Sequence, residues 1–410
     1  MQVLLINDHG RAYGGAELQM LAVRDSLAAR GHDVRLFSSN AEMIPGFPLL
    51  AERTCHGQTD LGQVVLQSAN PMAWQALRAE LRSNPPDVVH VRSFLWQLSP
   101  LILPLLRDLP VLHQAPTYKE ICPNGLKLLP DRTNCTHVAG SVCRDSGCVS
   151  SRTYQMARLQ MWLLKRWRSV LDVTTVLSRR AAERFTASGW TGVEVLPNPA
   201  DARDATSDLA THPTLAYCGR LSREKGVDVL IDAFACARRK IPNAMLVIAG
   251  TGGEEEALRR RAKPLGKSVR FLGHVPYKTL DTVLAPAWVQ AVPSIWHEPF
   301  GNVTLEAMMR GTAVLGANTG AISDVIVEAE TGYIAPPGNV DAWATRLIQM
   351  LSDKALCQRL GTAGRQRALK DFGRDRHTDR LLELYAKAQQ NCAARKRHAK
   401  ARAEQKELLK

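Results

Sequence analysis

The chain has few of the features that mark membrane-spanning or secreted, disulfide-rich proteins. None of its apolar runs reaches the roughly 20 residues that a membrane-spanning helix needs. Residues 1–7 lack the basic region of a signal peptide and predict a first β-strand instead. Nine cysteines, an odd number without a secretion signal, favour a reducing compartment. We therefore expect a cytoplasmic protein.

Acidic residues are scarce relative to basic ones. The chain has 53 Lys and Arg against 39 Asp and Glu, a formal net charge of +14. Such a surface favours nucleic acid, anionic lipid or phosphorylated substrates as partners. The basic segment 391–410 contains no Trp, Phe or Tyr on which a base could stack. A solvated or membrane-surface helix is expected there, and nucleic acid is not an expected partner.

Short apolar runs alternate with helical stretches along the whole chain. Because each strand–helix–strand unit of this kind builds a parallel sheet, the pattern predicts an α/β protein with doubly wound sheets. The length suggests two or three domains. Residues 200–213 are rich in Asp, Ala and Thr with almost no bulky apolar side chain, which marks a domain boundary.

Two glutamates, Glu298 and Glu306, flank a predicted turn between a strand and a helix. Pro299 and Gly301 mark this turn, so the helix should begin near residues 301–303. A helix N-terminus attracts an anion, and ionised carboxylates suit hydroxyl groups. The alternative is an ordinary strand–turn–helix with two solvated glutamates.

A predicted strand at 214–218 delivers a second polar segment. Arg220 follows its glycine turn, and Lys225 comes five positions later, just before a predicted helix. A guanidinium fork and an ammonium point charge near a helix start make a clamp for a diphosphate. Surface charge is the alternative explanation.

The first strand leads into a loop with Gly14 and Gly15, after which apolar residues recur at helical spacing. Glycines let the backbone approach an anion at a helix start. The loop is not a Walker motif, because the Lys–Ser/Thr pair is missing, and its glycine spacing differs from the dinucleotide fingerprint.

These segments together resemble the landmarks of family-four retaining glycosyltransferases of the GT-B fold, in the expected order over residues 1–388. The resemblance implies two Rossmann-like domains facing across a cleft. It implies an N-terminal acceptor-binding domain at 1–200 and a nucleotide-sugar-binding domain at 201–372. It also implies a helix at 373–390 that crosses back to the first domain, followed by the basic tail at 391–410.

The resemblance also implies roles for particular residues. Arg220 and Lys225 would hold the donor diphosphate, Glu298 would bind sugar hydroxyls, and Glu306 would bind the nucleotide ribose. The loop Gly14–Gly15 would close over the phosphates. The remaining donor contacts would come from the backbone of Phe300, Gly301, Asn302 and Val303.

His113 lies at the end of a predicted strand in a segment that resembles the family's passage of strand, His and Cys-Pro. The histidine of that passage contacts the transferred sugar or stabilises charge at the reaction centre. The acid that usually follows it is Gln114 here. His90 lies at a similar strand end, and for it we expect a structural role.

Four cysteines lie in a predicted loop insertion at 120–150. Their number suits a closed tetrahedral zinc site of structural type, although their spacing is looser than that of paired knuckles. The alternative is a set of unrelated loop cysteines or reversible disulfides. The residues are Cys122, Cys135, Cys143 and Cys148.

Residues 152–171 form a predicted amphipathic helix with tryptophans on one face and a ring of Arg and Lys. Such a helix lies in an anionic membrane interface or packs on the core with its basic stems extended. Both interpretations stay open on the sequence alone.

The resemblance implies a retaining hexosyltransferase that requires no metal or other cofactor for catalysis. The donor would be a UDP- or GDP-sugar, and the acceptor a glycan or lipid-linked hydroxyl in envelope polysaccharide or glycolipid assembly. The enzyme would work in the cytoplasm, at the inner face of the membrane. A GT-B sugar phosphorylase and a non-catalytic sugar-nucleotide-binding protein are the alternatives.

Overall fold

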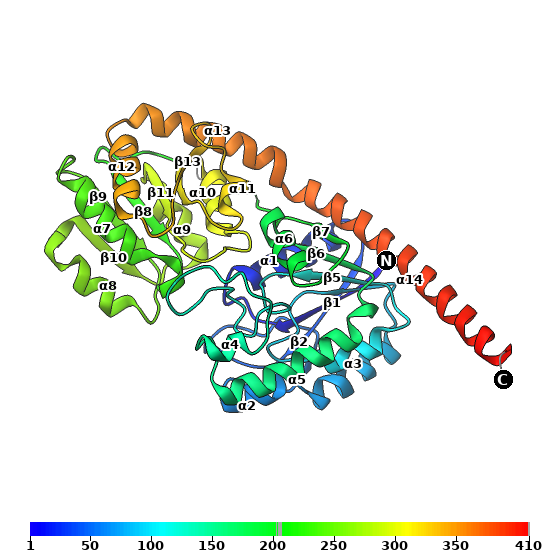
Figure 1. Cartoon of the computed structure of the whole chain (residues 1–410). Coiled ribbons are helices and arrows are strands. Elements are labelled where there is room, and N and C mark those ends of the chain that lie inside the picture. The colour runs from blue at the N-terminus through cyan, green and yellow to red at the C-terminus, as the bar shows by residue number, and fades with distance from the viewer. Residues whose placement is uncertain (202, 204–206, 409–410) are drawn as a thin grey trace. The chain divides into compact units, whose positions relative to one another are not determined.

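The computed structural model describes residues 1–201, 203 and 207–408. Residues 202 and 204–206 of the predicted boundary segment, and 409–410 of the predicted tail, lie outside the described residues. The chain divides into two compact units (Figure 1). Unit 1 comprises residues 1–126, 136–197 and 375–410, and unit 2 comprises residues 127–135 and 198–374.

Unit 1 is built on a seven-stranded sheet in the order β3-β2-β1-β4-β5-β6-β7, with every neighbouring pair parallel. The order reverses between β1 and β4, which is where a doubly wound sheet binds ligands at its carboxyl edge. The strands are β1 (Gln2–His9), β2 (Asp33–Ser39), β3 (Arg53–Cys55), β4 (Val88–Val91), β5 (Val111–Ala115), β6 (Val173–Val176) and β7 (Val193–Val195).

Helices flank the unit 1 sheet (Figure 1). They are α1 (Gly15–Ala29), α2 (Leu61–Leu66), α3 (Pro71–Ser83), α4 (Val142–Asp145), α5 (Ser151–Trp167), α6 (Arg179–Ala187) and α14 (Arg374–Leu408), with 3₁₀ turns η1 (Pro100–Leu106) and η2 (Arg168–Val170).

Unit 2 repeats the architecture with six parallel strands in the order β10-β9-β8-β11-β12-β13. Its order reverses between β8 and β11. The strands are β8 (Thr214–Cys218), β9 (Met245–Ala249), β10 (Val269–Gly273), β11 (Val289–Val292), β12 (Ala313–Ala317) and β13 (Gly332–Ala335). The predicted α/β class with two parallel sheets is confirmed.

The helices of unit 2 also flank its sheet (Figure 1). They are α7 (Val227–Arg238), α8 (Glu255–Ala262), α9 (Tyr277–Leu284), α10 (Asn302–Arg310), α11 (Ile322–Val325), α12 (Val340–Leu351) and α13 (Lys354–Phe372), with 3₁₀ turns η3 (Arg223–Lys225) and η4 (Lys263–Ser268).

Helix α14 is one continuous element rather than a closing helix followed by a separate tail at 391–410. No glycine or proline interrupts its sequence, so nothing breaks the helix at 390. Its residues Leu381, Leu384 and Tyr385 join the core of unit 1 beside β1 and α1. Beyond residue 390, Arg395 forms an ion pair with the buried Asp172 at 3.0 Å. Part of the predicted tail is therefore packed on unit 1.

The predicted insertion at 120–150 does not belong wholly to the first unit. Residues 127–135 group with unit 2, because Arg132 forms an ion pair with Asp228 at 2.7 Å and donates to the Arg223 carbonyl. Asn134 donates a further bond to the Ile295 carbonyl at 3.2 Å. No local sequence pattern predicts these contacts, because they join residues about 90 to 160 positions apart.

No helix among the described residues is both long enough and apolar enough to cross a membrane.

Candidate active site

The loop that leaves β8 runs backbone to backbone along the loop that leaves β9. Gly219 donates to the Ala249 carbonyl at 3.0 Å, and Leu221 donates to the Thr251 carbonyl at 2.9 Å. A Cβ at Gly250 would lie 1.9 Å from the Gly219 oxygen, so only glycine permits this approach. The course of the segment that carries Arg220 is therefore fixed by the main chain.

Lys225 is placed by a second close approach, to the segment that leaves β11. Gly226 follows it in the left-handed conformation, and a Cβ there would lie 2.2 Å from the Pro293 oxygen. Ile295 donates its N–H to the Glu224 carbonyl at 2.8 Å. These contacts bring Lys225 to the point where the strand order of unit 2 reverses.

Glu298, a residue only 8% exposed, pairs with Lys225 at that point. Lys225 Nζ lies 2.8 Å from Oε1 and 3.0 Å from Oε2. Ser294 Oγ and Trp296 Nε1 donate to Oε2 at 2.9 and 2.8 Å. Within the described residues Oε1 accepts only from Lys225, so it retains acceptor capacity for a ligand hydroxyl.

These partners determine the charge of Glu298. Burial acts to raise its pKa, but the ion pair with Lys225 and the bonds from Ser294 and Trp296 outweigh burial and lower it. The carboxylate is therefore ionised at neutral pH. Its main chain is held as well, since Ala321 donates to the Glu298 carbonyl at 2.9 Å.

Helix α10 begins immediately after the predicted turn. Gly301 is its N-cap residue, with a φ of 82°, and Asn302 is its first residue. This confirms the predicted start near 301–303. No side chain caps the helix, so the first-turn N–H groups of Asn302 and Val303 have no side-chain cap acceptor. The Phe300 side chain is buried and packs against the Phe372 ring, which helps to hold the turn in place.

Glu306 lies on α10 in a different environment. Burial raises its pKa, and Arg203 and Arg310 oppose the shift without reversing it. No described residue donates a hydrogen bond to its carboxylate. Glu306 is therefore a partly buried acceptor whose capacity the described protein leaves unused.

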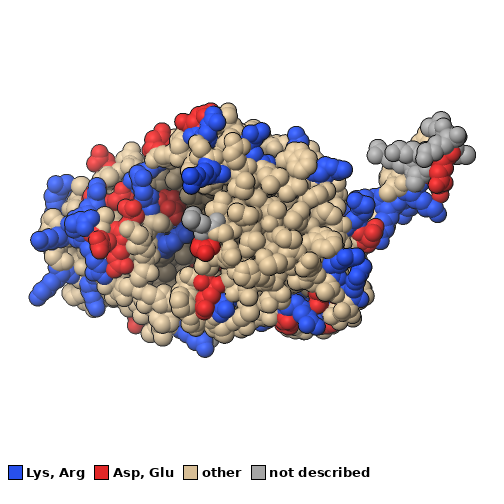
Figure 2. All heavy atoms as spheres, turned by 90° about the horizontal axis from the view of Figure 1, so that it is seen from below, with Lys and Arg blue, Asp and Glu red and all other residues tan. Residues whose placement is uncertain are grey.

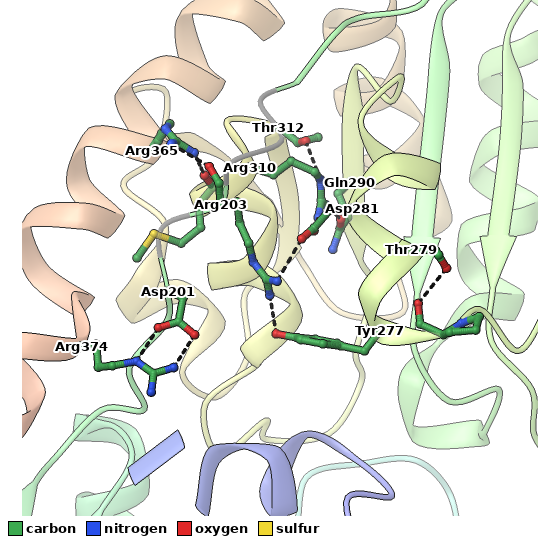
Figure 3. Close-up of polar contacts among 12 residues, drawn as sticks. Asp201, Arg203, Tyr277, Thr279, Asp281, Gln290, Arg310, Thr312, Arg365 and Arg374 are labelled. Atoms are coloured by element: carbon green, nitrogen blue, oxygen red, sulfur yellow. Dashed lines mark hydrogen bonds and ion pairs between the residues drawn. The ribbon is translucent and has the colours of Figure 1, made fainter. Parts of the chain in front are cut away.

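A buried polar network fixes the end of α10 (Figure 3). Arg310, which is 1% exposed, lies 2.7 Å from Asp281 Oδ1 and also donates to Gln290. The other carboxylate oxygen of Asp281, Oδ2, lies 2.9 Å from an Arg203 guanidinium nitrogen. The Arg203 guanidinium also lies over the Tyr277 ring. The sequence interpretation missed this network, because its residues come from four separate segments. It holds the helix that carries Glu306.

Arg220 lies in the same loop as Lys225 but is far more open. Its side chain is 64% exposed and pairs with Glu224 at 2.9 Å. Glu224 also accepts from Ser222 Oγ at 2.6 Å. Because a guanidinium has five N–H donors, this single pair leaves most of them for a ligand.

In unit 1, the loop before α1 has the predicted strand–glycine–helix arrangement. Gly14 is the N-cap of α1 and makes no side-chain cap bond. A Cβ at Gly14 would meet only Glu17 Oε2, at 3.5 Å, which is ordinary contact. Packing within the described chain thus gives no reason for glycine at 14, whereas close approach of a ligand would.

His113 is fully buried at β5 and pairs with a residue that the sequence interpretation missed. Its Nδ1 donates to the Val91 carbonyl at 3.0 Å, and its Nε2 lies 3.3 Å from Glu120 Oε1. The acid absent at Gln114 is therefore supplied by Glu120, where the chain turns back after β5. His90 has the expected structural role, since its Nδ1 lies 2.9 Å from the Tyr385 hydroxyl of α14.

The predicted zinc ligands belong to different units. Cys135 groups with unit 2, and Cys122, Cys143 and Cys148 group with unit 1. Across the described residues, which include all four, no group of three or more His, Cys, Asp or Glu side chains is placed to share a metal ion. Structural zinc stays a prediction, and no step below depends on it.

Two family models match the chain in succession. "Glycosyltransferase Family 4" matches residues 13–204, and "Glycosyl transferases group 1" matches residues 201–367. Glycogen synthase of Mycobacterium tuberculosis is 28% identical over 88% of this chain and 87% of its own length. Phosphatidyl-myo-inositol mannosyltransferase of Mycobacterium leprae is 26% identical over 86% and 87%.

A solved structure shows the same fold. Anabaena HepE in complex with UDP-glucose superposes with a TM-score of 0.67 at 17% identity, over 94% of this chain and 99% of that one. With two parallel sheets, an ordered cation–glutamate pair after β8 and β11, and both family models, the chain belongs to the group 1 glycosyltransferases of the GT-B fold.

Proposed function

We propose that this glycosyltransferase moves a sugar from a nucleotide-sugar donor to an acceptor hydroxyl with retention of anomeric configuration. The observation that carries the proposal is the Lys225–Glu298 ion pair, which is ordered beside the uncapped start of α10. A cation, a carboxylate and a helix N-terminus then lie within one unit. This combination suits a ligand with both phosphate and sugar hydroxyls.

The donor diphosphate would lie at the positive end of this set. Lys225 and Arg220 would contact its oxygens, and the α10 N-terminus would add its dipole. These groups are in place before the reaction, so they stabilise the charge that develops on the departing diphosphate. The proposal gives two side-chain cations the role that a divalent ion has in other transferases.

The sugar and the nucleoside would bind on either side of the diphosphate. Glu298 Oε1 would accept from sugar hydroxyls, and Glu306 would accept from the ribose. Phe300 to Val303 would contribute backbone contacts. From unit 1, Gly14 and Gly15 would approach the phosphates, and His113 would act at the transferred sugar.

The test is a panel of UDP- and GDP-sugars added to the full chain. Any donor that is bound should raise the unfolding temperature, because a ligand specific for the folded state stabilises it in proportion to RT ln(1 + [L]/Kd). The same donor should be consumed in the presence of an acceptor. A requirement for inorganic phosphate in the reverse direction would favour a sugar phosphorylase instead.

We further propose a lipid-linked acceptor, reached at an anionic membrane surface. Helix α5 turns Tyr154, Leu163 and Leu164 inward, while Trp162 and Leu159 point outward at 62% and 39% exposure. The sequence predicted one apolar face that carries the tryptophans, whereas in the structure Trp162 lies outside the buried face of α5. Trp162 is therefore not used in packing α5 against the core.

Charge on the same surface of α5 favours lipid. The helix contains no acidic residue; Arg158, Lys165 and Arg166 lie within about one turn of Trp162, and Arg152 is exposed nearer the start of the helix. Tryptophan among basic residues is typical of helices that lie in an anionic interface. Figure 2 shows the molecule from below, with a broad area free of Lys, Arg, Asp and Glu that has both basic and acidic side chains around it.

Vesicle binding tests this surface. The protein should sediment with vesicles containing anionic phospholipid and not with purely zwitterionic ones. Trp162→Ser should weaken binding several-fold, and Arg158→Glu with Lys165→Glu should abolish it, since each basic residue contributes about 1 kcal/mol near such a surface. Leu369→Ser, at another exposed apolar position, is the control. Equal binding by all variants would contradict the proposal.

A further inference from the structure

Residues 127–135, the middle of the cysteine-rich insertion, form a closed hairpin that belongs to unit 2. Leu128 and Asn134 pair as an antiparallel bridge, and the Cys135 N–H donates to the Lys127 carbonyl at 2.8 Å. The main chain of the 127–135 hairpin thus closes on itself. This leaves polar side chains of the hairpin to bond to other segments of unit 2.

Arg132, near the tip of the 127–135 hairpin, holds the turn that carries Lys225. Its Nη1 and Nη2 form a fork on Asp228, at 2.7 Å from Oδ2 and 2.9 Å from Oδ1. Its Nη2 also donates to the Arg223 carbonyl at 3.1 Å. Arg223 is the first residue of η3, and Asp228 lies in the first turn of α7. One guanidinium therefore bonds to the chain on both sides of Lys225.

Two observations show that the contact between Arg132 and Asp228 is a specific one. The φ of Arg132 is 71°, a left-handed conformation that residues other than glycine adopt uncommonly and that persists where surrounding contacts hold it. Burial acts to raise the pKa of Asp228, but the bonds and charge of Arg132, together with backbone N–H groups, outweigh burial and lower it. Asp228 is therefore ionised at neutral pH, and the fork is charge-assisted on both sides.

Asn134 holds the segment that leads to Glu298. Its Nδ2 donates to the Ile295 carbonyl at 3.2 Å. The Ile295 N–H donates in turn to the Glu224 carbonyl at 2.8 Å. Ile295 lies between the two residues whose side chains donate to Glu298. Both polar groups of its main chain are thus bonded, one to the 127–135 hairpin and the other to the loop of Lys225.

The 127–135 hairpin therefore bonds to both segments that form the Lys225–Glu298 ion pair. We propose that it positions this pair: Arg132 sets the turn that carries Lys225, and Asn134 sets the main chain beside Glu298. Misplacing a reacting group by about 1 Å, even from a distant site, can cost about a hundred-fold in rate. The inference rests on the proposed function for what the pair binds, and on the contacts of the hairpin alone for how the pair is held.

Titration of Glu298 tests this positioning without any substrate. In ¹³C NMR of protein labelled at its glutamate carboxyl groups, the Glu298 signal is assigned by its loss in Glu298→Gln. Arg132→Asn should raise the pKa of Glu298 toward its ordinary value, because the Lys225 contact that lowers it is loosened. Asparagine is used because it tolerates the left-handed backbone at this position. An unchanged pKa of Glu298 would overturn the proposal.

Two variants on α7 complete this comparison. Asp228→Asn removes the other half of the fork and should raise the pKa of Glu298 as Arg132→Asn does. Asp232→Asn, four positions further along the same helix, is the matched control. It breaks a similar ion pair, in which Arg261 Nε lies 2.7 Å from Asp232 Oδ1, and should leave the pKa of Glu298 unchanged. An equal rise in the control would overturn the proposal, because loss of any ion pair on α7 would then suffice.

Kinetics with a donor from the nucleotide-sugar panel give the second readout. Arg132→Asn should lower kcat/KM for the donor about ten-fold or more and leave the acceptor KM within about two-fold. A hairpin with a merely structural role would lower the unfolding temperature and leave turnover per folded molecule unchanged, and that result would contradict the proposal. If the wild-type protein transfers no sugar, the proposed function fails, and the Glu298 titration still decides the role of the hairpin.

Discussion

Glu298 and Glu306 have the same side chain, but the groups around their carboxylates differ. Both carboxylates are withdrawn from solvent. Glu298 has a cation and two neutral donors in contact, and its pKa is lowered. Glu306 has only distant arginines, and its pKa is raised. The described residues supply Glu298 with a cation and two hydrogen-bond donors, and they supply Glu306 with no hydrogen bond.

The difference shows which glutamate belongs to the rigid framework. Removing the Lys225 partner of Glu298 leaves an uncompensated buried charge, so stability and transfer should both fall. Removing Glu306 deletes a group that folding does not use. The predictions below test this contrast.

Lys225→Met should have the largest effect. It leaves Glu298 charged and unpaired, and breaking a buried pair in this way costs about 3–5 kcal/mol of unfolding free energy. Transfer should fall at least about a thousand-fold, because the diphosphate loses its cation. Urea denaturation and turnover measure the two losses.

The double variant Lys225→Met with Glu298→Gln is the matched control. It removes both charges and should recover most of the lost stability while transfer stays absent. The account would be contradicted if the double variant recovered both stability and transfer, or if it recovered neither.

Acidification should separate the stability contributions of the two glutamates. Because the folded pKa of Glu298 lies below its ordinary value of 4.5, its stabilisation is present above pH 4.5 and is lost as pH falls through the lowered value. Glu298→Gln should therefore lack this part of the acid destabilisation. Parallel stability–pH curves for wild type and variant would argue against the shift.

Glu306→Gln should weaken nucleotide binding about ten-fold or more and cost little stability. Its raised folded pKa means that the charged form is already disfavoured in the folded state, so losing the charge does not destabilise the fold. In the wild-type protein, nucleotide affinity should fall as the pH decreases through the raised pKa of Glu306. This fall should occur at a higher pH than the loss of stability caused by protonation of Glu298, whose pKa is lowered. Calorimetric titration across pH measures both effects; a wild-type pH profile in the variant would refute the ribose role.

Arg220→Lys should have the smallest effect, about two- to ten-fold on the donor KM. The side chain is 64% exposed and its partner Glu224 is on the same loop, so its charge is largely screened by water. A loss as large as that of Lys225→Met would show that Arg220 is the principal cation.

Sequence reasoning reached the features that local chemistry encodes. Gly301 and Pro299 required a turn, and α10 begins there. Alternating apolar runs required parallel sheets, and both are present. Lys225 and Glu298 were expected to lie close together, and they form an ion pair after β8 and β11; their role in donor binding stays a prediction.

It did not reach contacts that the fold creates between distant segments. Glu120 meets His113 because the chain turns back after β5, and the next-residue acid expected from the family pattern was absent. Arg310 pairs with Asp281 across 29 positions, and Arg132 with Asp228 across 96. Helical periodicity placed Trp162 on an apolar face, yet only packing shows which face turns outward.

The most direct test of the account is transfer by Glu298→Gln with the donor found in the nucleotide-sugar panel. The amide has the shape of the carboxylate, and its oxygen can still accept from Ser294 and Trp296. It lacks the negative charge that pairs with Lys225. We predict a folded protein that still binds the free nucleotide but transfers sugar at least about a hundred-fold more slowly. Wild-type turnover in this variant would contradict the central claim that the Lys225–Glu298 pair forms the donor site.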